Sequence, residues 1–165
     1  MNKTKTIIVA AAALACGLAG AQSLVSERSI SLNAAMELAT ASMERCRADG
    51  YKVTITVLNR HARTAVVLSD DGVNPHTVEN SMRKAYTAFT TRAPTADMAK
   101  RTQPGLSGFM LLERMTSIEG GLPIFAGKDG KELVGAVGIS GATGGEKDAA
   151  CGQTGIDKIA KGLGG

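Results

Sequence analysis

The stretch GGLPIFAGKDGKELVGAVGISGATGGEKDAAC, residues 120–151, predicts two paired strands followed by a glycine-rich loop and the start of a helix. An Asp-Gly pair at residues 129–130 is a strong signal for a tight turn between antiparallel strands. The return strand covers residues 132–140, and a last helix covers residues 146–163. Because a hairpin and not a helical crossover joins the strands, the stretch favours an antiparallel sheet.

A similar unit precedes it in the chain. Residues 31–50 place apolar side chains at helical spacing, with Ser31 able to cap the start and Gly50 placed to end the helix. Residues 51–58 alternate apolar and polar side chains, which is typical of a strand with one buried face. Residues 64–71 are its predicted return strand, so this unit also forms a hairpin.

Two helices connect the hairpins. The first is predicted over residues 76–92 with Thr77 as its cap, and a short second one over residues 95–101. The predicted apolar face of the first of these two helices consists of Val78, Met82, Ala85, Tyr86 and Phe89. The whole order is helix, hairpin, two helices, hairpin, helix, which predicts an α+β fold with an antiparallel β-sheet flanked by helices.

Residues 1–21 have the three-part layout of a secretory signal peptide. Lys3 and Lys5 precede an alanine-rich apolar run, and the Ala-Gly-Ala ending at Ala21 matches a cleavage pattern. We therefore predict cleavage after Ala21, and the alternative is lipid attachment at Cys16. The predicted division of the chain is a signal peptide over residues 1–21, a short extension over residues 22–30, and one domain over residues 31–165.

A cleaved signal peptide predicts a periplasmic or secreted protein without a remaining transmembrane segment. The formal charge of +4 includes Lys3 and Lys5, so it falls to +2 after cleavage. Aromatic residues make up 3% of the chain and no basic run occurs, so a platform for stacking bases is lacking and we expect no nucleic-acid partner. An oxidising compartment permits a disulfide between Cys46 and Cys151, and two half-buried free thiols are the open alternative.

The glycine-rich loop after residue 140 matches neither common phosphate-binding motif. A P-loop needs a hydroxyl after its lysine, whereas Asp148 follows Lys147 here. The dinucleotide-binding fingerprint needs a strand–helix–strand unit, whereas this loop follows a hairpin strand. Gly135 and Gly138 instead leave space on the strand for a helix, another subunit or a flat ligand.

Chemistry-bearing residues are sparse. The chain has two histidines, His61 in the first hairpin turn and His76 at a predicted helix start, and no cluster typical of a zinc or two-carboxylate site. A helix N-terminus disfavours a cation, so His76 is expected to be neutral, which is the form that binds iron.

Three segments, residues 31–63, 81–95 and 120–156, resemble the GlcG/HbpS-like haem-binding proteins, which also occur as the C-terminal domain of PduO-type proteins. The most specific piece combines G-G-x-P-I, a hairpin, V-G-A-V-G-I-S-G and D-x-x-C. The resemblance implies a GlcG-like, profilin-like layered domain that assembles into homo-oligomers and binds haem or a corrinoid-related ligand. It would make the glycines packing features of the family.

The resemblance also implies roles for individual residues. His61 matches the family histidine, although its turn lacks the glycine pair usual in the family, and either His61 or His76 would ligate the haem iron. Arg83 and Lys84 would pair with haem propionates, or alternatively they are solvated helix charges. If the first and last helices are neighbours, a disulfide between their cysteines is plausible.

The predicted function is that of a secreted or periplasmic haem-binding protein in haem or iron handling or sensing. Two alternatives stay open. One is a haem-degrading or redox enzyme of the same fold, and the other is an oligomeric accessory protein that binds another small ligand such as a corrinoid.

Overall fold

The computed structural model describes residues 24–101 and 108–164, so the predicted signal peptide lies outside the described residues. Its elements, in chain order, are α1 (Leu32–Ala48), β1 (Thr54–Asn59), β2 (Thr64–Ser69), α2 (His76–Thr91), α3 (Thr95–Arg101), the 3-10 helix η1 (Gly108–Leu111), β3 (Gly121–Ala126), β4 (Glu132–Ser140) and α4 (Gly145–Leu163). The strands form one sheet in the order β2-β1-β4-β3, and every neighbouring pair is antiparallel. This architecture confirms the predicted α+β fold.

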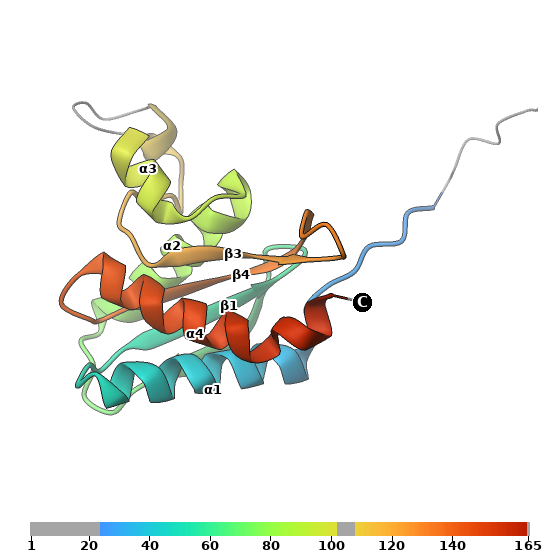
Figure 1. Ribbon diagram of the computed structural model, residues 1–165. Helices are drawn as coiled ribbons and strands as arrows, with labels where there is room; N and C mark the ends of the chain where they lie inside the picture. Colours follow the sequence, from blue (N-terminus) through green and yellow to red (C-terminus); the bar gives the residue numbers. More distant parts are fainter. Residues whose placement is uncertain (1–23, 102–107, 165) are drawn as a thin grey trace, which may run out of the picture.

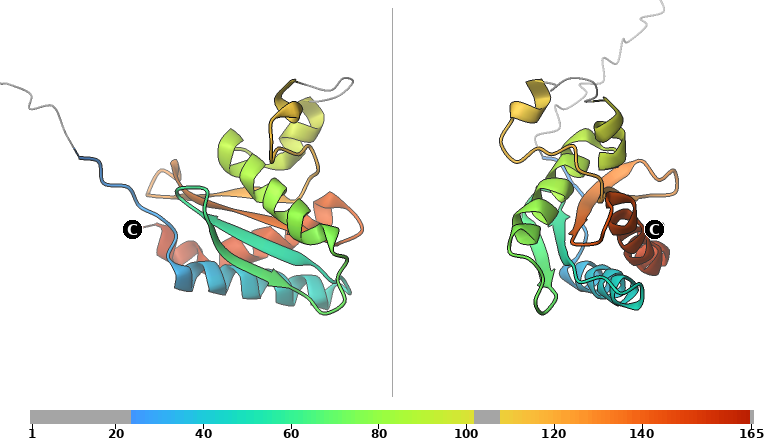
Figure 2. Two further views of the ribbon diagram at one scale, coloured as in Figure 1. Left: turned by 180° about the vertical axis from the view of Figure 1, so that it is seen from behind. Right: turned by 90° about the vertical axis from the view of Figure 1, so that its left-hand side faces the viewer.

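Helices cover both faces of the sheet. α1 and α4 run side by side on one face, whereas α2 lies across the other, as Figures 1 and 2 show. Strands β1 and β4 are central, and their pairing brings Thr54 beside Ser140 at one end and Asn59 beside Gly135 at the other. The four-stranded sheet is therefore the middle layer of three. None of the helices in residues 24–101 and 108–164 is long and apolar enough to cross a membrane.

The α1–α4 face holds the apolar core. Ile55, Val57, Val137 and Ile139 are fully buried there. A disulfide joins Cys46 of α1 to Cys151 of α4, with 5.5 Å between the two Cα atoms. Both cysteines are buried, so the bridge that the family fold made plausible is confirmed, and the alternative of half-buried thiols is wrong.

Glycine allows α1 and α4 to approach closely. A Cβ atom on Gly155 would lie 2.5 Å from the carbonyl oxygen of Leu38. The predicted ends of α1 are also confirmed, because the Ser31 hydroxyl accepts a hydrogen bond from the Ala34 amide and Gly50 adopts a φ of 83°.

The opposite face corrects the prediction that β1 buries only its apolar side. Thr54 and Thr56 are fully buried under α2, and their hydroxyls lie 2.8 Å from those of Thr77 and Ser81, respectively. Thr77 is therefore not the helix cap, because its hydroxyl faces the sheet and donates to the Asn74 carbonyl.

The predicted apolar face of α2 is only partly confirmed, because Met82, Tyr86 and Phe89 are half-buried. Val78 is 41% exposed, and Ala85 is the one residue of that set that is fully buried. The buried side of the helix instead consists of Thr77, Ser81, Lys84, Ala85, Thr87 and Ala88. Hydrogen bonds to β1, to β4 and to the segment 115–116 offset the cost of burying these polar groups, and hydrophobic periodicity does not detect such bonds.

Gly138 explains how α2 fits against the sheet. A Cβ atom there would lie 2.1 Å from the carbonyl oxygen of Ser81 and 2.5 Å from the amide nitrogen of Ala85. The sequence leaves open whether a helix, another subunit or a flat ligand lies against this glycine. In the structure the neighbour is helix α2. This part of the sheet face is therefore closed to a flat ligand.

Candidate functional site

A cleft of about 520 Å³ lies at the end of the sheet where β1 begins, β4 ends and α2 starts. We call it the α2 cleft. Its walls are the first half of α2, the segments 50–52 and 72–74, and the glycine-rich loop of residues 141–145 with the first turn of α4. The volume falls within the range of about 300–1,000 Å³ that is typical of small-molecule sites.

Helix α2 directs three polar side chains into this cleft. His76, Asn80 and Lys84 are four residues apart along the chain, so they share one side of the helix. His76 is exposed at the mouth, whereas Lys84 is 1% exposed at the inner end. Between them, the Asn80 amide donates a hydrogen bond of 2.9 Å to the Ser140 hydroxyl at the end of β4. The cleft therefore runs from a solvent-accessible imidazole to a buried ammonium.

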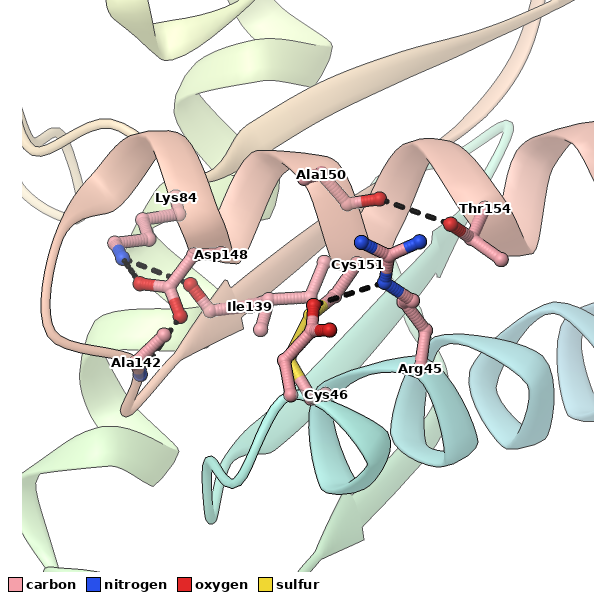
Figure 3. The surroundings of a disulfide bond; sticks show 10 residues. Arg45, Cys46, Lys84, Ile139, Ala142, Asp148, Ala150, Cys151 and Thr154 are labelled. Carbon is pink, nitrogen blue, oxygen red and sulfur yellow. Dashed lines mark hydrogen bonds and ion pairs between the residues drawn. A yellow bond between two sulfur atoms is a disulfide. The ribbon is translucent and has the colours of Figure 1, made fainter.

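The inner end of the cleft is a buried ion pair, shown in Figure 3. The Lys84 ammonium lies 2.6 Å from a carboxylate oxygen of Asp148 and donates a second hydrogen bond of 2.8 Å to the Ile139 carbonyl. Burial lowers the pKa of Lys84 and raises the pKa of Asp148, and the attraction between the two groups opposes both shifts. The predicted alternative in which Lys84 is a solvated helix charge is wrong.

The glycine-rich loop is fixed from several sides. Its Ala142 amide donates a hydrogen bond of 3.0 Å to the other Asp148 oxygen. A Cβ atom on Gly141, whose φ is 137°, would lie 2.3 Å from the Lys52 carbonyl oxygen. A Cβ atom on Gly145 would lie 2.5 Å from the Glu119 Cβ. These glycines therefore act in packing, as the resemblance implies.

Arg83 and His61 lie in different surroundings. Arg83 is exposed on α2 and forms a 2.6 Å ion pair with Glu79, next to a shallow hollow that also includes His76 and Ile118. His61 is exposed in the turn after β1, where its backbone amide donates to the Asn59 side chain. Since Asn59 and Thr54 mark opposite ends of β1, the two histidines lie at opposite ends of the sheet. The structure thus places His76 and Lys84 in the α2 cleft and Arg83 in the neighbouring hollow beside His76, and it leaves His61 apart.

Several residues at the cleft were missed by sequence reasoning. Asp148 was considered only as part of D-x-x-C and as a departure from the P-loop motif, and Lys52, Asn80 and Ile118 were not singled out. The four-residue spacing of His76, Asn80 and Lys84 is the signal that could have identified the α2 side of the cleft. Within residues 24–101 and 108–164, no group of three His, Cys, Asp or Glu side chains is arranged to hold a metal ion.

Comparisons with known proteins give a consistent result. The family model described as "Haem degrading protein HbpS-like" matches residues 30–157. An uncharacterized 15.0 kDa protein of Citrobacter freundii, from the dhaT-dhaS intergenic region, is 32% identical over 132 residues, which cover 78% of this chain and 90% of that protein.

Two solved structures are also similar. The crystal structure of HbpS is 32% identical with a TM-score of 0.75, and the match covers 87% of this chain and 96% of HbpS. The crystal structure of a PduOC:haem complex is 26% identical with a TM-score of 0.71, and the match covers 79% of this chain and 95% of PduOC.

Proposed function

The chain belongs to the HbpS-like family, and we propose that it binds haem at the α2 cleft with the imidazole of His76 as a ligand of the iron. The observation that carries this proposal is the exposure of the His76 side chain and its lack of a protein partner. Its imidazole is exposed at the mouth of the cleft and has no hydrogen bond or ion pair within the described part of the chain. An exposed imidazole nitrogen without a protein partner is available to coordinate iron.

The other residues at the mouth fit a flat, amphipathic ligand. Ile118 is 51% exposed beside His76, and Tyr51 and Val73 add further apolar surface to the cleft. Lys52 in the cleft and Arg83 in the neighbouring hollow would supply cations for the two propionates. Lys84 is already paired with Asp148, so in this proposal it supports the cleft wall instead of pairing with a propionate. Bound haem would supply an iron centre for ligand or electron-transfer chemistry.

Haemin titration of residues 22–165, followed by the Soret band, tests this proposal. His76→Ala should weaken binding by at least tenfold, whereas the matched control His61→Ala should bind like the wild type. A loss confined to His61→Ala would move the iron ligand to the other end of the sheet. A broad band that does not saturate in the wild type would overturn haem binding, and a parallel titration with cobalamin would then test the corrinoid alternative.

Haem degradation is a second candidate, favoured by the description of the matching family as haem-degrading. The described residues include no group that identifies the required co-reactant, which is either a reductant acting with dioxygen or a peroxide, so the test must supply one. The Soret band of the haem-loaded protein should decay with ascorbate or peroxide faster than that of free haemin if the protein promotes degradation. Protection of the haem relative to the free control would favour a binding role instead.

We also propose a periplasmic or secreted location and a homo-oligomeric state. The predicted signal peptide and the Cys46–Cys151 disulfide support the location, because structural disulfides persist mainly in oxidising compartments. The oligomer is an expectation from the resemblance. Cell fractionation with N-terminal sequencing of the mature protein tests the first proposal and the predicted cleavage after Ala21. Light scattering tests the second.

A further inference from the structure

We propose that Lys84 and Asp148 are positioning residues, which together fix the glycine-rich loop as the wall of the α2 cleft that faces His76. The proposed consequence for ligand binding rests on the haem-binding function proposed above. The consequence for the loop does not.

A continuous chain of hydrogen bonds links the three structural layers to this loop (Figure 3). Lys84 comes from α2 and reaches the Ile139 carbonyl of β4 at 2.8 Å. The same ammonium holds one oxygen of Asp148, from the first turn of α4, at 2.6 Å. The second Asp148 oxygen accepts the hydrogen bond from the Ala142 amide, in the loop between β4 and α4. The position of the loop is thereby coupled to the helix that carries His76.

The surrounding backbone encloses this pair closely. A Cβ atom on Gly120 would lie 2.7 Å from the Asp148 Cβ and 2.9 Å from the Lys84 ammonium. The side chains of Lys84 and Asp148 are 1% and 3% exposed. A glycine at position 120, with a φ of 115°, thus lets the backbone seal the pair from water.

Stability alone is a poor reason for this arrangement. Desolvation of two charges offsets much of their attraction, and apolar side chains of similar size often stabilise a core equally well. Apolar side chains cannot accept the Ala142 amide hydrogen, however. The loop needs such an acceptor because the half-buried Ala142 amide would otherwise be an unpaired donor. We therefore assign the pair to loop positioning.

Two double variants separate this role from a general effect on stability. Lys84→Met/Asp148→Asn removes both charges but retains an oxygen that can accept the Ala142 amide hydrogen. Lys84→Met/Asp148→Leu removes the charges and the acceptor together. In hydrogen exchange, the Leu variant should exchange amides of residues 141–145 about tenfold faster than the Asn variant, as expected for one lost hydrogen bond. Haemin should bind the Leu variant about three- to tenfold more weakly than the Asn variant.

The outcomes distinguish this inference from the proposed function. Equal exchange of the loop in the two double variants, with equal unfolding midpoints, would overturn the positioning role. Faster exchange with unchanged haemin affinity would retain loop positioning and reject its consequence for the ligand. If wild-type protein binds no haemin but the exchange difference is present, the proposed function fails and loop positioning stands. If the Leu variant does not fold, Lys84→Met/Asp148→Ala provides the same comparison with a smaller side chain.

Discussion

The two faces of the sheet are built by different chemistry. Under α1 and α4, apolar side chains, a disulfide and the close approach at Gly155 join the layers. Under α2, hydroxyl pairs join the helix to the sheet, and the ion pair from Lys84 to Asp148 at the start of α4 adds to them. Apolar contacts are non-directional, whereas hydrogen bonds fix orientation. The comparison indicates that the first face mainly supplies stability and the second mainly positions the α2 cleft.

Loss of the disulfide should have the largest effect on stability. It closes a loop with a sequence separation of 105 residues, for which restriction of the unfolded chain corresponds to about 5 kcal/mol. Cys46→Ala/Cys151→Ala should therefore lower the free energy of unfolding by about that amount in urea denaturation. Dithiothreitol should destabilise the wild type and leave the variant unchanged. If the comparison of the two faces is right, the folded variant still binds haemin like the wild type.

Breaking the buried ion pair should have the second-largest effect on stability and should affect the cleft as well. Lys84→Met leaves Asp148 buried without its cation, which is expected to cost about 3 kcal/mol at pH 8. Burial already raises the pKa of Asp148, and removal of Lys84 takes away the main group that opposes this rise. A raised pKa in the folded state means that protonation stabilises the fold at low pH and that this stability is lost as pH rises.

The destabilisation by Lys84→Met should therefore be smaller at pH 5 than at pH 8. Urea unfolding at both pH values measures this difference. Lys84→Met/Asp148→Leu, which buries no carboxylate, is the matched control and should show no such pH dependence. Equal destabilisation of Lys84→Met at the two pH values would contradict an unpaired buried carboxylate.

Adding a methyl group at the close contact between α2 and the sheet should have an intermediate effect on stability. Gly138→Ala places a methyl group against the backbone of Ser81 and Ala85, so α2 must move away from the sheet. We expect a loss of about 2 kcal/mol in the free energy of unfolding, together with weaker haemin binding. Gly162→Ala in α4 is the matched control, because open space surrounds that position and the helical backbone favours alanine. Unchanged haemin affinity in a destabilised Gly138→Ala protein would separate α2 packing from the site.

The sequence was more informative for one face than for the other. Helical and strand periodicity predicted α1, both hairpins and α4, because those elements bury apolar side chains. The same reasoning predicted the bounds of α2 but not its buried side, which is mostly polar. Lys84 shows why. A lysine in a helix is usually solvated, and its burial depends on a carboxylate 64 residues away in the chain, which local patterning cannot predict.

The candidate site was predicted only in part, again because some of its contacts join residues that lie far apart in the chain. His76 was predicted as a candidate iron ligand at a helix start, and the structure places it at the mouth of the α2 cleft. Its separation from His61 follows from the strand pairing, which fixes the two ends of β1. The other wall of the cleft depends on Asp148 and the loop that it holds, and that contact forms only when α4 packs against the sheet.

Adjacent residues of β1 allow the smallest and most direct test of the two-face comparison. Thr56 faces the Ser81 hydroxyl under α2, whereas Val57 lies in the apolar core on the other face. The Ser81 hydroxyl donates to the Val78 carbonyl, so Thr56 must be the donor in the pair. Thr56→Val removes that donor without leaving Ser81 unpaired, and we expect a cost of about 1 kcal/mol.

The reciprocal change, Val57→Thr, buries a hydroxyl among apolar side chains and should cost about 2 kcal/mol. Both changes nearly preserve side-chain shape, so urea unfolding compares the chemistry of the two faces at neighbouring positions. Haemin affinity should fall for Thr56→Val, because α2 loses an orienting contact, and stay unchanged for Val57→Thr. If Thr56→Val is less destabilised than Val57→Thr but binds haemin more weakly, one face mainly supplies stability and the other mainly positions the cleft. If affinity follows stability in both variants, the faces act as one unit and the division fails.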